Sequence, residues 1–172
     1  MVYGTWCLSS GCIGYGIIEI ERSLRVVEVL ALELQPPLVL DAVLAVGEVI
    51  REMRDSGLGY ALVTRDGRLA GIFTERDVFL SVLDDEAVLR QPISALMSPE
   101  PVCVSGNDPV WRAVTLMHEG GYRQIPVVDK AGKIQGCVRH KDIAGYLVDH
   151  FAGHVLNLPP DPEQRAHTPE GG

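Results

Sequence analysis

Several features that would assign a chain to a membrane, a secreted or a nucleic-acid-binding class are missing here. No apolar run approaches the roughly 20 residues that a membrane-spanning helix needs, which argues against membrane insertion. The start of the chain has no basic segment before its apolar residues, so it is a poor secretory signal. We therefore expect a cytoplasmic protein.

Positive charge is scarce. The 172 residues hold 15 Lys and Arg against 23 Asp and Glu, a formal net charge of −8, and no run of basic residues stands out. Such a chain repels a polyphosphate backbone, so nucleic acid is not expected as a partner. A nucleotide with two or three phosphates is a different ligand, because a few fixed cations and helix N-termini can hold it.

Cysteine is scarce as well, with four in the chain. Cys103 and Cys137 fall in apolar runs, where a free thiol behaves as a small hydrophobe. Cys7 and Cys12 could pair, but no second cluster completes a zinc set, so no metal site is predicted. There is also no Ser-His-Asp order, no phosphate loop of Walker type and no zinc-deaminase signature, and we expect no enzyme.

What the sequence does contain is an internal repeat. Two sets of apolar residues with helical spacing carry it: Val46, Val49, Ile50 and Met53 and, 64 residues later, Val110, Ala113, Val114 and Met117. The second helix has a start signal, with Asp108 as N-cap and Pro109 as first helical residue. Both helices run into a glycine, Gly57 or Gly121.

Each helix is followed by two short apolar runs separated by a turn, and then by a second helix. The first copy has runs at 60–63 and 69–73 around Asp66-Gly67, a strong hairpin signal. The second copy has runs at 125–128 and 134–138. Short strands at 38–40 and 102–104 complete two βαββα units. One unit of about 60 residues buries too little surface to be stable alone, so the two copies should pack together. We expect an α/β fold in which a pseudo-twofold axis relates the copies and their small sheets pack face to face.

The outer parts of the chain are less regular. Residues 20–34 predict a helix that ends before Pro36-Pro37 and either caps the paired copies or joins a dimer contact. We divide the chain into an N-terminal extension (1–35), a first copy (36–92), a second copy (93–152) and a proline-containing, disordered tail (153–172).

One motif occurs at matching places in both copies. Residues 71–77 (GIFTERD) end a strand and begin a helix, and residues 136–142 (GCVRHKD) keep the glycine and the aspartate. The first motif resembles the ligand signature of cystathionine-β-synthase (CBS) domains, in which a threonine and an aspartate follow a glycine. Residues 93–102 are similar to the segment that enters a second CBS domain. The resemblance covers residues 36–152.

The resemblance implies that Asp77 holds the ribose hydroxyls of an adenine nucleotide and that Thr74 holds its phosphate. It also implies a set of residues around the adenine base: Gly59, Tyr60 and Ala61. Arg76 could add a cation near the phosphates. In isolation, Thr74 and Asp77 have a second interpretation, as caps of the helix that follows them.

The second copy departs from the motif, because Arg139 stands where the first copy has Thr74. Arg139 could grip a phosphate, fill the cleft and abolish the site, or lie on the surface. We expect at most one high-affinity nucleotide per chain, centred on Asp77, with Asp142 a weaker candidate.

The function implied by the resemblance is regulatory. An adenosine-containing ligand such as AMP, ADP or ATP would bind in the cleft between the copies of a homodimeric module and change how a partner protein is regulated. No further cofactor is required. One alternative is a ligand-free dimerisation scaffold. A third hypothesis is a small enzyme or metal-binding protein that uses His150 and His154, or Cys7 and Cys12.

Overall fold

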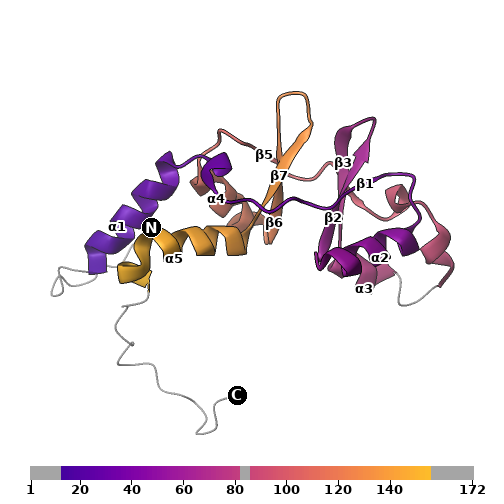
Figure 1. The fold of residues 1–172 in the computed structure, drawn as a ribbon, viewed down its shortest axis with the longest axis horizontal. Coiled ribbons are helices and arrows are strands. Elements are labelled where there is room, and N and C mark those ends of the chain that lie inside the picture. The colour runs from indigo at the N-terminus through magenta and orange to yellow at the C-terminus, as the bar shows by residue number, and fades with distance from the viewer. Residues whose placement is uncertain (1–12, 82–85, 156–172) are drawn as a thin grey trace, which may run out of the picture.

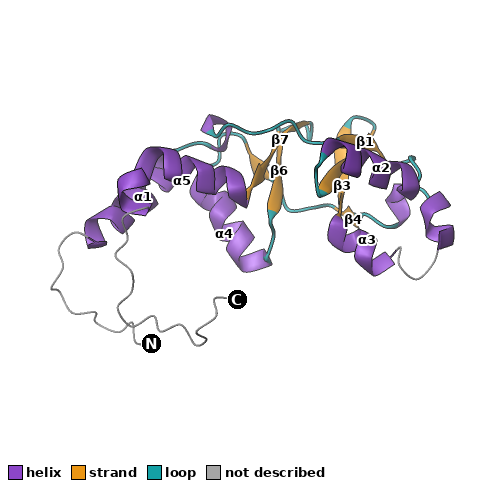
Figure 2. Ribbon diagram, turned by 60° about the horizontal axis from the view of Figure 1, so that its bottom comes forward, coloured by secondary structure: helices purple, strands orange, loops and turns teal. Residues whose placement is uncertain are grey.

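A computed structural model describes residues 13–81 and 86–155. The predicted order of elements is confirmed in both copies. The first copy contains β1 (Val39–Asp41), α2 (Val46–Ser56), β2 (Tyr60–Arg65), β3 (Arg68–Thr74) and α3 (Glu75–Ser81). The second contains β5 (Val104–Ser105), α4 (Val110–Gly120), β6 (Gln124–Val128), β7 (Ile134–Arg139) and α5 (His140–Val155). The two sheets lie next to each other in the middle of the molecule, with helices toward its two ends (Figures 1 and 2).

The two sheets share the topology of their first three strands. The first has the order β1-β2-β3-β4, where β4 is Ser98–Pro99, and the second has the order β5-β6-β7. In each, the first strand pairs in parallel with the second, which forms an antiparallel hairpin with the third. Asp66 and Gly67 have φ angles of 53° and 73°, as a tight hairpin turn requires. The Asp-Gly signal therefore predicts this turn correctly.

The helix that follows the first strand of each copy packs its apolar face inward. Val46, Val49 and Met53 are buried on α2, and Val110 and Ala113 are buried on α4, in agreement with the predicted spacing. The glycines that end these helices, Gly57 and Gly121, both have a φ of 66°, which a residue with a side chain rarely adopts.

One predicted helix start needs correction. Pro109, not Asp108, is the N-cap of α4. The Asp108 carboxylate instead accepts a hydrogen bond from the Ser105 amide at 2.8 Å, and the Val110 amide donates to the Val27 carbonyl at 2.8 Å. An amide at the start of the helix is therefore satisfied by the N-terminal segment.

The predicted helix over 20–34 is also wrong in its C-terminal half. The helix α1 spans Ile13–Val26, and a 3₁₀ turn, η1 (Val29–Ala31), follows it. The α-helix stops because the backbone beyond it bonds to the second copy, where Val29 donates to the Asp108 carbonyl at 2.9 Å. An amide used in this way cannot also close a helical turn.

The same arrangement recurs 64 residues later. The 3₁₀ turn η3 (Ile93–Ala95) packs against the first copy, where Ile93 donates to the Leu44 carbonyl at 2.8 Å. The repeat thus extends into the segments that precede each copy, and residues 27–34 pack on the copy that is more distant in sequence. The boundaries at 35/36 and 92/93 stay predictions.

The core consists of one cluster within each copy and a third between the sheets. The third cluster joins Tyr60 and Leu62 of β2 to Cys137 of β7. Above it the hairpin tips meet, where Arg68 Nε donates to the Ala131 carbonyl at 2.8 Å. The predicted face-to-face packing of the sheets is confirmed.

The N-terminal helix covers the second copy. The helix α1 contacts α4 and α5, Ser23 and Tyr146 share a hydrogen bond of 3.0 Å, and the Arg25 guanidinium lies 4.5 Å from the ring centre of Trp111. Within the described residues, none of the helices has the length and apolar character to cross a membrane. Residues 153–155, which the prediction assigns to a disordered tail, are the end of α5, and residues 156–172 of that tail lie outside the described residues.

Candidate functional site

The motif of the first copy forms a turn in which Thr74 and Asp77 are bonded to each other. Thr74 ends β3 and Asp77 lies in the first turn of α3. The amide and the hydroxyl of Thr74 both donate to Asp77 Oδ2, at 2.8 and 2.7 Å. Both residues are partly exposed, and within the described part of the chain Asp77 Oδ1 accepts no hydrogen bond. This turn caps the helix and still leaves one carboxylate oxygen for a ligand.

In the second copy the aspartate is fully engaged. Arg139 donates to Asp142 Oδ2 from its amide and from Nε, each at 2.9 Å, and Nη2 donates to Oδ1. The fourth contact runs from Arg139 Nη1 to Gln35 Oε1 at 3.0 Å. Each side chain of the ion pair is only 7% exposed. The bond to Asp142 raises the pKa of the Arg139 guanidinium, so this group stays charged. The interpretation of Arg139 as a surface residue is therefore wrong.

The three residues predicted to lie around a base differ from one another in burial and in neighbours. Gly59 lies beneath the Glu75 carboxyl group, whose Cδ would be 3.0 Å from a Cβ at this position. Tyr60 pairs with Thr74 between β2 and β3, while its side chain is buried in the cluster between the sheets. The side chain of Ala61 is fully buried in the core of the first copy. The Ala61 side chain therefore cannot reach a ligand, and Gly59 has none, so each of these two can contact a ligand only through its backbone.

The motif glycines are needed for packing. A Cβ on Gly71 would lie 2.4 Å from Met97 Sδ and 3.0 Å from the Ser98 carbonyl oxygen. A Cβ on Gly136 would lie 3.0 Å from Leu34 Cδ1. Both glycines thus lie against the segments that enter each copy.

Sequence reasoning missed Gln35, because it is distant in sequence from the motif that it contacts. The 64-residue repeat aligns Gln35 with Pro99, and Pro99 of β4 pairs with Gly71. Extending the repeat into the segments before each copy could have placed Gln35 beside the second motif.

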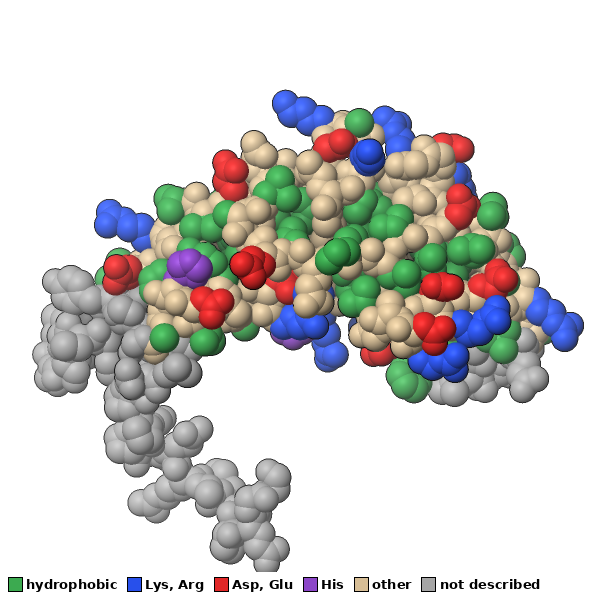
Figure 3. All heavy atoms as spheres, viewed as in Figure 1, with side chains coloured by type: hydrophobic (Ala, Val, Ile, Leu, Met, Phe, Trp, Pro, Cys, Tyr) green, Lys and Arg blue, Asp and Glu red, His purple; other side chains and the backbone are tan. Residues whose placement is uncertain are grey.

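Arg76 is exposed, and none of the ion pairs among the described residues includes it. It directly precedes Asp77 in the sequence. Figure 3 shows Lys, Arg, Asp and Glu interspersed over the described part of one face of the molecule.

Of the residues of the third hypothesis, the structure describes the side chain of His150 alone. His150 Nδ1 lies 3.0 Å from the Tyr146 carbonyl, and the His150 ring stacks on Tyr146 with the ring centres 4.2 Å apart. The side chain of His154, together with Cys7 and Cys12, lies outside the described residues. Among the side chains that the structure describes, no group of three His, Cys, Asp or Glu could hold a metal ion.

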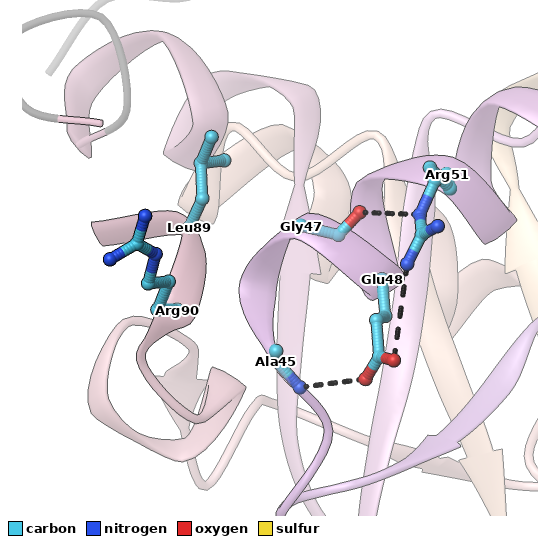
Figure 4. A pocket seen from close by; sticks show the side chains of 6 residues that line it. All are labelled: Ala45, Gly47, Glu48, Arg51, Leu89 and Arg90. Carbon is cyan, nitrogen blue, oxygen red and sulfur yellow. Dashed lines mark hydrogen bonds and ion pairs between the residues drawn. The ribbon is translucent and has the colours of Figure 1, made fainter. Parts of the chain in front are cut away.

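An open hollow of about 380 Å³ lies elsewhere on the first copy, between the start of α2 and the 3₁₀ helix η2 (Glu86–Arg90). Figure 4 shows its lining: Ala45, Gly47, Glu48, Arg51, Leu89 and Arg90. Its polar groups are bonded to one another, since Arg51 donates to the Gly47 carbonyl and Glu48 accepts from the Ala45 amide. The hollow includes neither Thr74 nor Asp77.

The chain is similar in sequence to several known proteins. An uncharacterized 17.7 kDa protein of Acidianus ambivalens is 28% identical over 105 residues, which cover 60% of this chain and 63% of that protein. Inosine-5'-monophosphate dehydrogenase of Yersinia pestis is 37% identical over 92 residues, 52% of this chain but only 18% of the dehydrogenase. The chain thus spans less than two thirds of each of these two relatives.

A solved structure of a CBS domain protein from Pyrobaculum aerophilum, complexed with AMP, superposes with a TM-score of 0.63 at 24% identity. The match covers 76% of this chain and 96% of that one. The CBS domain family model matches twice, over residues 31–84 and 93–149, which together are more than half of the chain. The chain therefore belongs to the CBS domain family and contains two CBS domains.

Proposed function

We propose that the chain is a regulatory module that binds one adenine nucleotide at the Thr74–Asp77 turn. The observation that carries the proposal is the difference between the two aspartates. Asp142 has both carboxylate oxygens bonded to Arg139, whereas Asp77 keeps Oδ1 without a partner among the described residues. A carboxylate oxygen of this kind can accept hydrogen bonds from a ribose diol.

The other groups at the turn suit the remaining parts of a nucleotide. Arg76 presents an exposed guanidinium to phosphate oxygens. The Thr74 hydroxyl, which donates to Asp77 in the free protein, can rotate and donate to a phosphate instead. The AMP complex of the Pyrobaculum protein, which has the same fold, supports a mononucleotide as ligand.

The module itself performs no reaction in this proposal. Ligand binding would shift the relative positions of the two CBS domains, and a partner protein or a second copy of the chain would respond to that shift. We place this function in the cytoplasm. The net charge of −8 opposes nucleic acid as the partner.

Thermal unfolding with and without ligand tests the proposal. AMP, ADP, ATP and S-adenosylmethionine are each added at millimolar concentration to the wild type, Asp77→Asn and Asp149→Asn. A ligand at 100 times its Kd should stabilise the protein by about 2.7 kcal/mol, a shift of several degrees in Tm. Asp149 is exposed on α5 and provides a control with the same change in charge.

We expect a shift in the wild type and in Asp149→Asn that is lost in Asp77→Asn. No shift with any of the four ligands would contradict the proposal and favour a ligand-free dimerisation scaffold. One observation favours that second function. Three large apolar side chains of the first copy are exposed: Val43, Phe79 and Leu80, at 78%, 67% and 70%. Sedimentation of the wild type and of Phe79→Ser would test it.

A further inference from the structure

In the second motif the Arg139 guanidinium is bonded to both carboxylate oxygens of Asp142, whereas in the first motif Asp77 keeps one oxygen open among the described residues. Asp142 accepts three hydrogen bonds from Arg139, and they involve both of its oxygens. A ribose diol needs the same oxygens as acceptors. A nucleotide could use Asp142 only after the guanidinium had moved away.

Burial makes that movement costly. With 7% of each side chain exposed, the pair has little access to water. Arginine does not lose its proton in proteins, so displacement would leave two buried charges without their partner. A two-point guanidinium–carboxylate pair is also among the strongest polar contacts in proteins.

One segment distant in sequence bonds to the guanidinium, and the first copy lies near it. Gln35, in the segment between η1 and β1, accepts from Nη1 at 3.0 Å. Tyr60 of the first copy is buried against Cys137 and is close enough to the ion pair to interact electrostatically with both charges. Arg139 is thus surrounded by groups from the N-terminal segment, the first copy and the second copy.

We propose that Arg139 closes the second cleft as a built-in occupant, which takes the place on Asp142 that a nucleotide's ribose would need. The second copy then acts as a permanently filled half of the module. The proposal extends the proposed function, since it limits nucleotide binding to the Thr74–Asp77 turn.

The test compares the number of AMP molecules bound per chain in the wild type and in Arg139→Thr, by equilibrium dialysis of the full chain. Threonine restores the residue of the first copy, whose amide and hydroxyl both donate to the aspartate. We expect one AMP per wild-type chain and two per Arg139→Thr chain, with the second lost in Arg139→Thr/Asp142→Asn. The control Arg123→Thr removes an exposed arginine from the same copy and should still bind one.

Two AMP molecules per wild-type chain, or the same number in the wild type and in folded Arg139→Thr, would overturn the closure. If the wild type binds no AMP while Arg139→Thr binds one through Asp142, the proposed function fails and the closure stands. A measurement on the wild type remains informative if Arg139→Thr does not fold. The Arg139 Nε–H should keep its protection from solvent exchange at saturating AMP, and loss of that protection would also overturn the closure.

Discussion

The phenol of Tyr60, in the first CBS domain, packs against the thiol of Cys137 in the second, and both side chains are buried. Burial raises the pKa of the Cys137 thiol to about 12, and it also raises the pKa of Tyr60 above its ordinary value. Both groups are therefore neutral at physiological pH, and the contact depends on their neutrality.

This contact predicts a loss of stability in alkali. A thiol whose pKa is higher in the folded than in the unfolded state stabilises the fold fully below the unfolded pKa of about 9, and the contribution declines between about 9 and 12. Cys137 should lower the free energy of unfolding by at most about 1.4 kcal/mol per pH unit in that range, and Tyr60 adds to the loss above pH 10. Urea unfolding at pH 8, 9 and 10 measures the slope. Cys137→Ala should reduce it, and an equal slope in this variant would contradict the assignment.

The same burial predicts slow alkylation of Cys137. Only the thiolate reacts, and Cys137 is both protonated and fully buried, whereas Cys103 is partly exposed. Iodoacetamide at pH 8 should modify Cys137 in the native protein much more slowly than in denaturant, as followed by peptide mass spectrometry. Cys103, whose pKa burial also raises, should react at an intermediate rate. Equal rates for Cys137 in the native and denatured protein would argue against its position between the sheets.

The buried ion pair predicts a large cost for removing one partner. Arg139→Ala leaves Asp142 charged and buried, and we expect about 3–5 kcal/mol of destabilisation by urea unfolding. The double variant Arg139→Met/Asp142→Leu should recover much of this loss, because it removes both charges. Arg54→Ala breaks the exposed pair with Asp55 and should cost no more than about 1 kcal/mol. Similar costs for Arg139→Ala and Arg54→Ala would show that the buried pair is not formed in solution.

Gly71 is closely packed and Gly145 is not, which predicts opposite effects on stability when each is replaced by alanine. Gly71→Ala places a methyl group against Met97 and the Ser98 carbonyl, and overpacking of this kind costs about 1–3 kcal/mol. Gly145 lies in α5, and a Cβ there meets no atom within 4 Å among the described residues, so Gly145→Ala should stabilise by about 0.5–1 kcal/mol. Thermal unfolding measures both. A neutral Gly71→Ala would mean that Met97 is not held against the strand.

Much of the fold could be predicted because it depends on local patterns. The helical spacing of apolar residues within each copy, the Asp66-Gly67 turn and the C-terminal glycines act over a few residues, and each predicts an element that the structure contains. The helix end at Val26 could not be predicted in this way. The chain leaves the helix there because its backbone bonds to Asp108, a partner some 80 residues away that no local pattern indicates.

In the candidate site, too, the local contacts could be predicted and the long-range ones could not. The mutual capping of Thr74 and Asp77 is a contact over three residues, and the sequence indicates it. The burial of Arg139, which rules out a surface role, could not be predicted, because it depends on Gln35, Tyr60 and Cys137, which only the folded chain brings together. Whether Gly59, Tyr60 and Ala61 surround a base stays a prediction.

The segment that follows α1 has a consequence for biosynthesis. Residues 27–30 emerge from the ribosome before the first CBS domain, yet they hydrogen-bond to residues 106–110 of the second. They therefore cannot form these hydrogen bonds until most of the chain has been translated. Closure of the second domain is a contact of long sequence separation, and such contacts slow folding. We expect the first domain, whose 3₁₀ turn follows it directly, to acquire protected amides earlier during synthesis than the second.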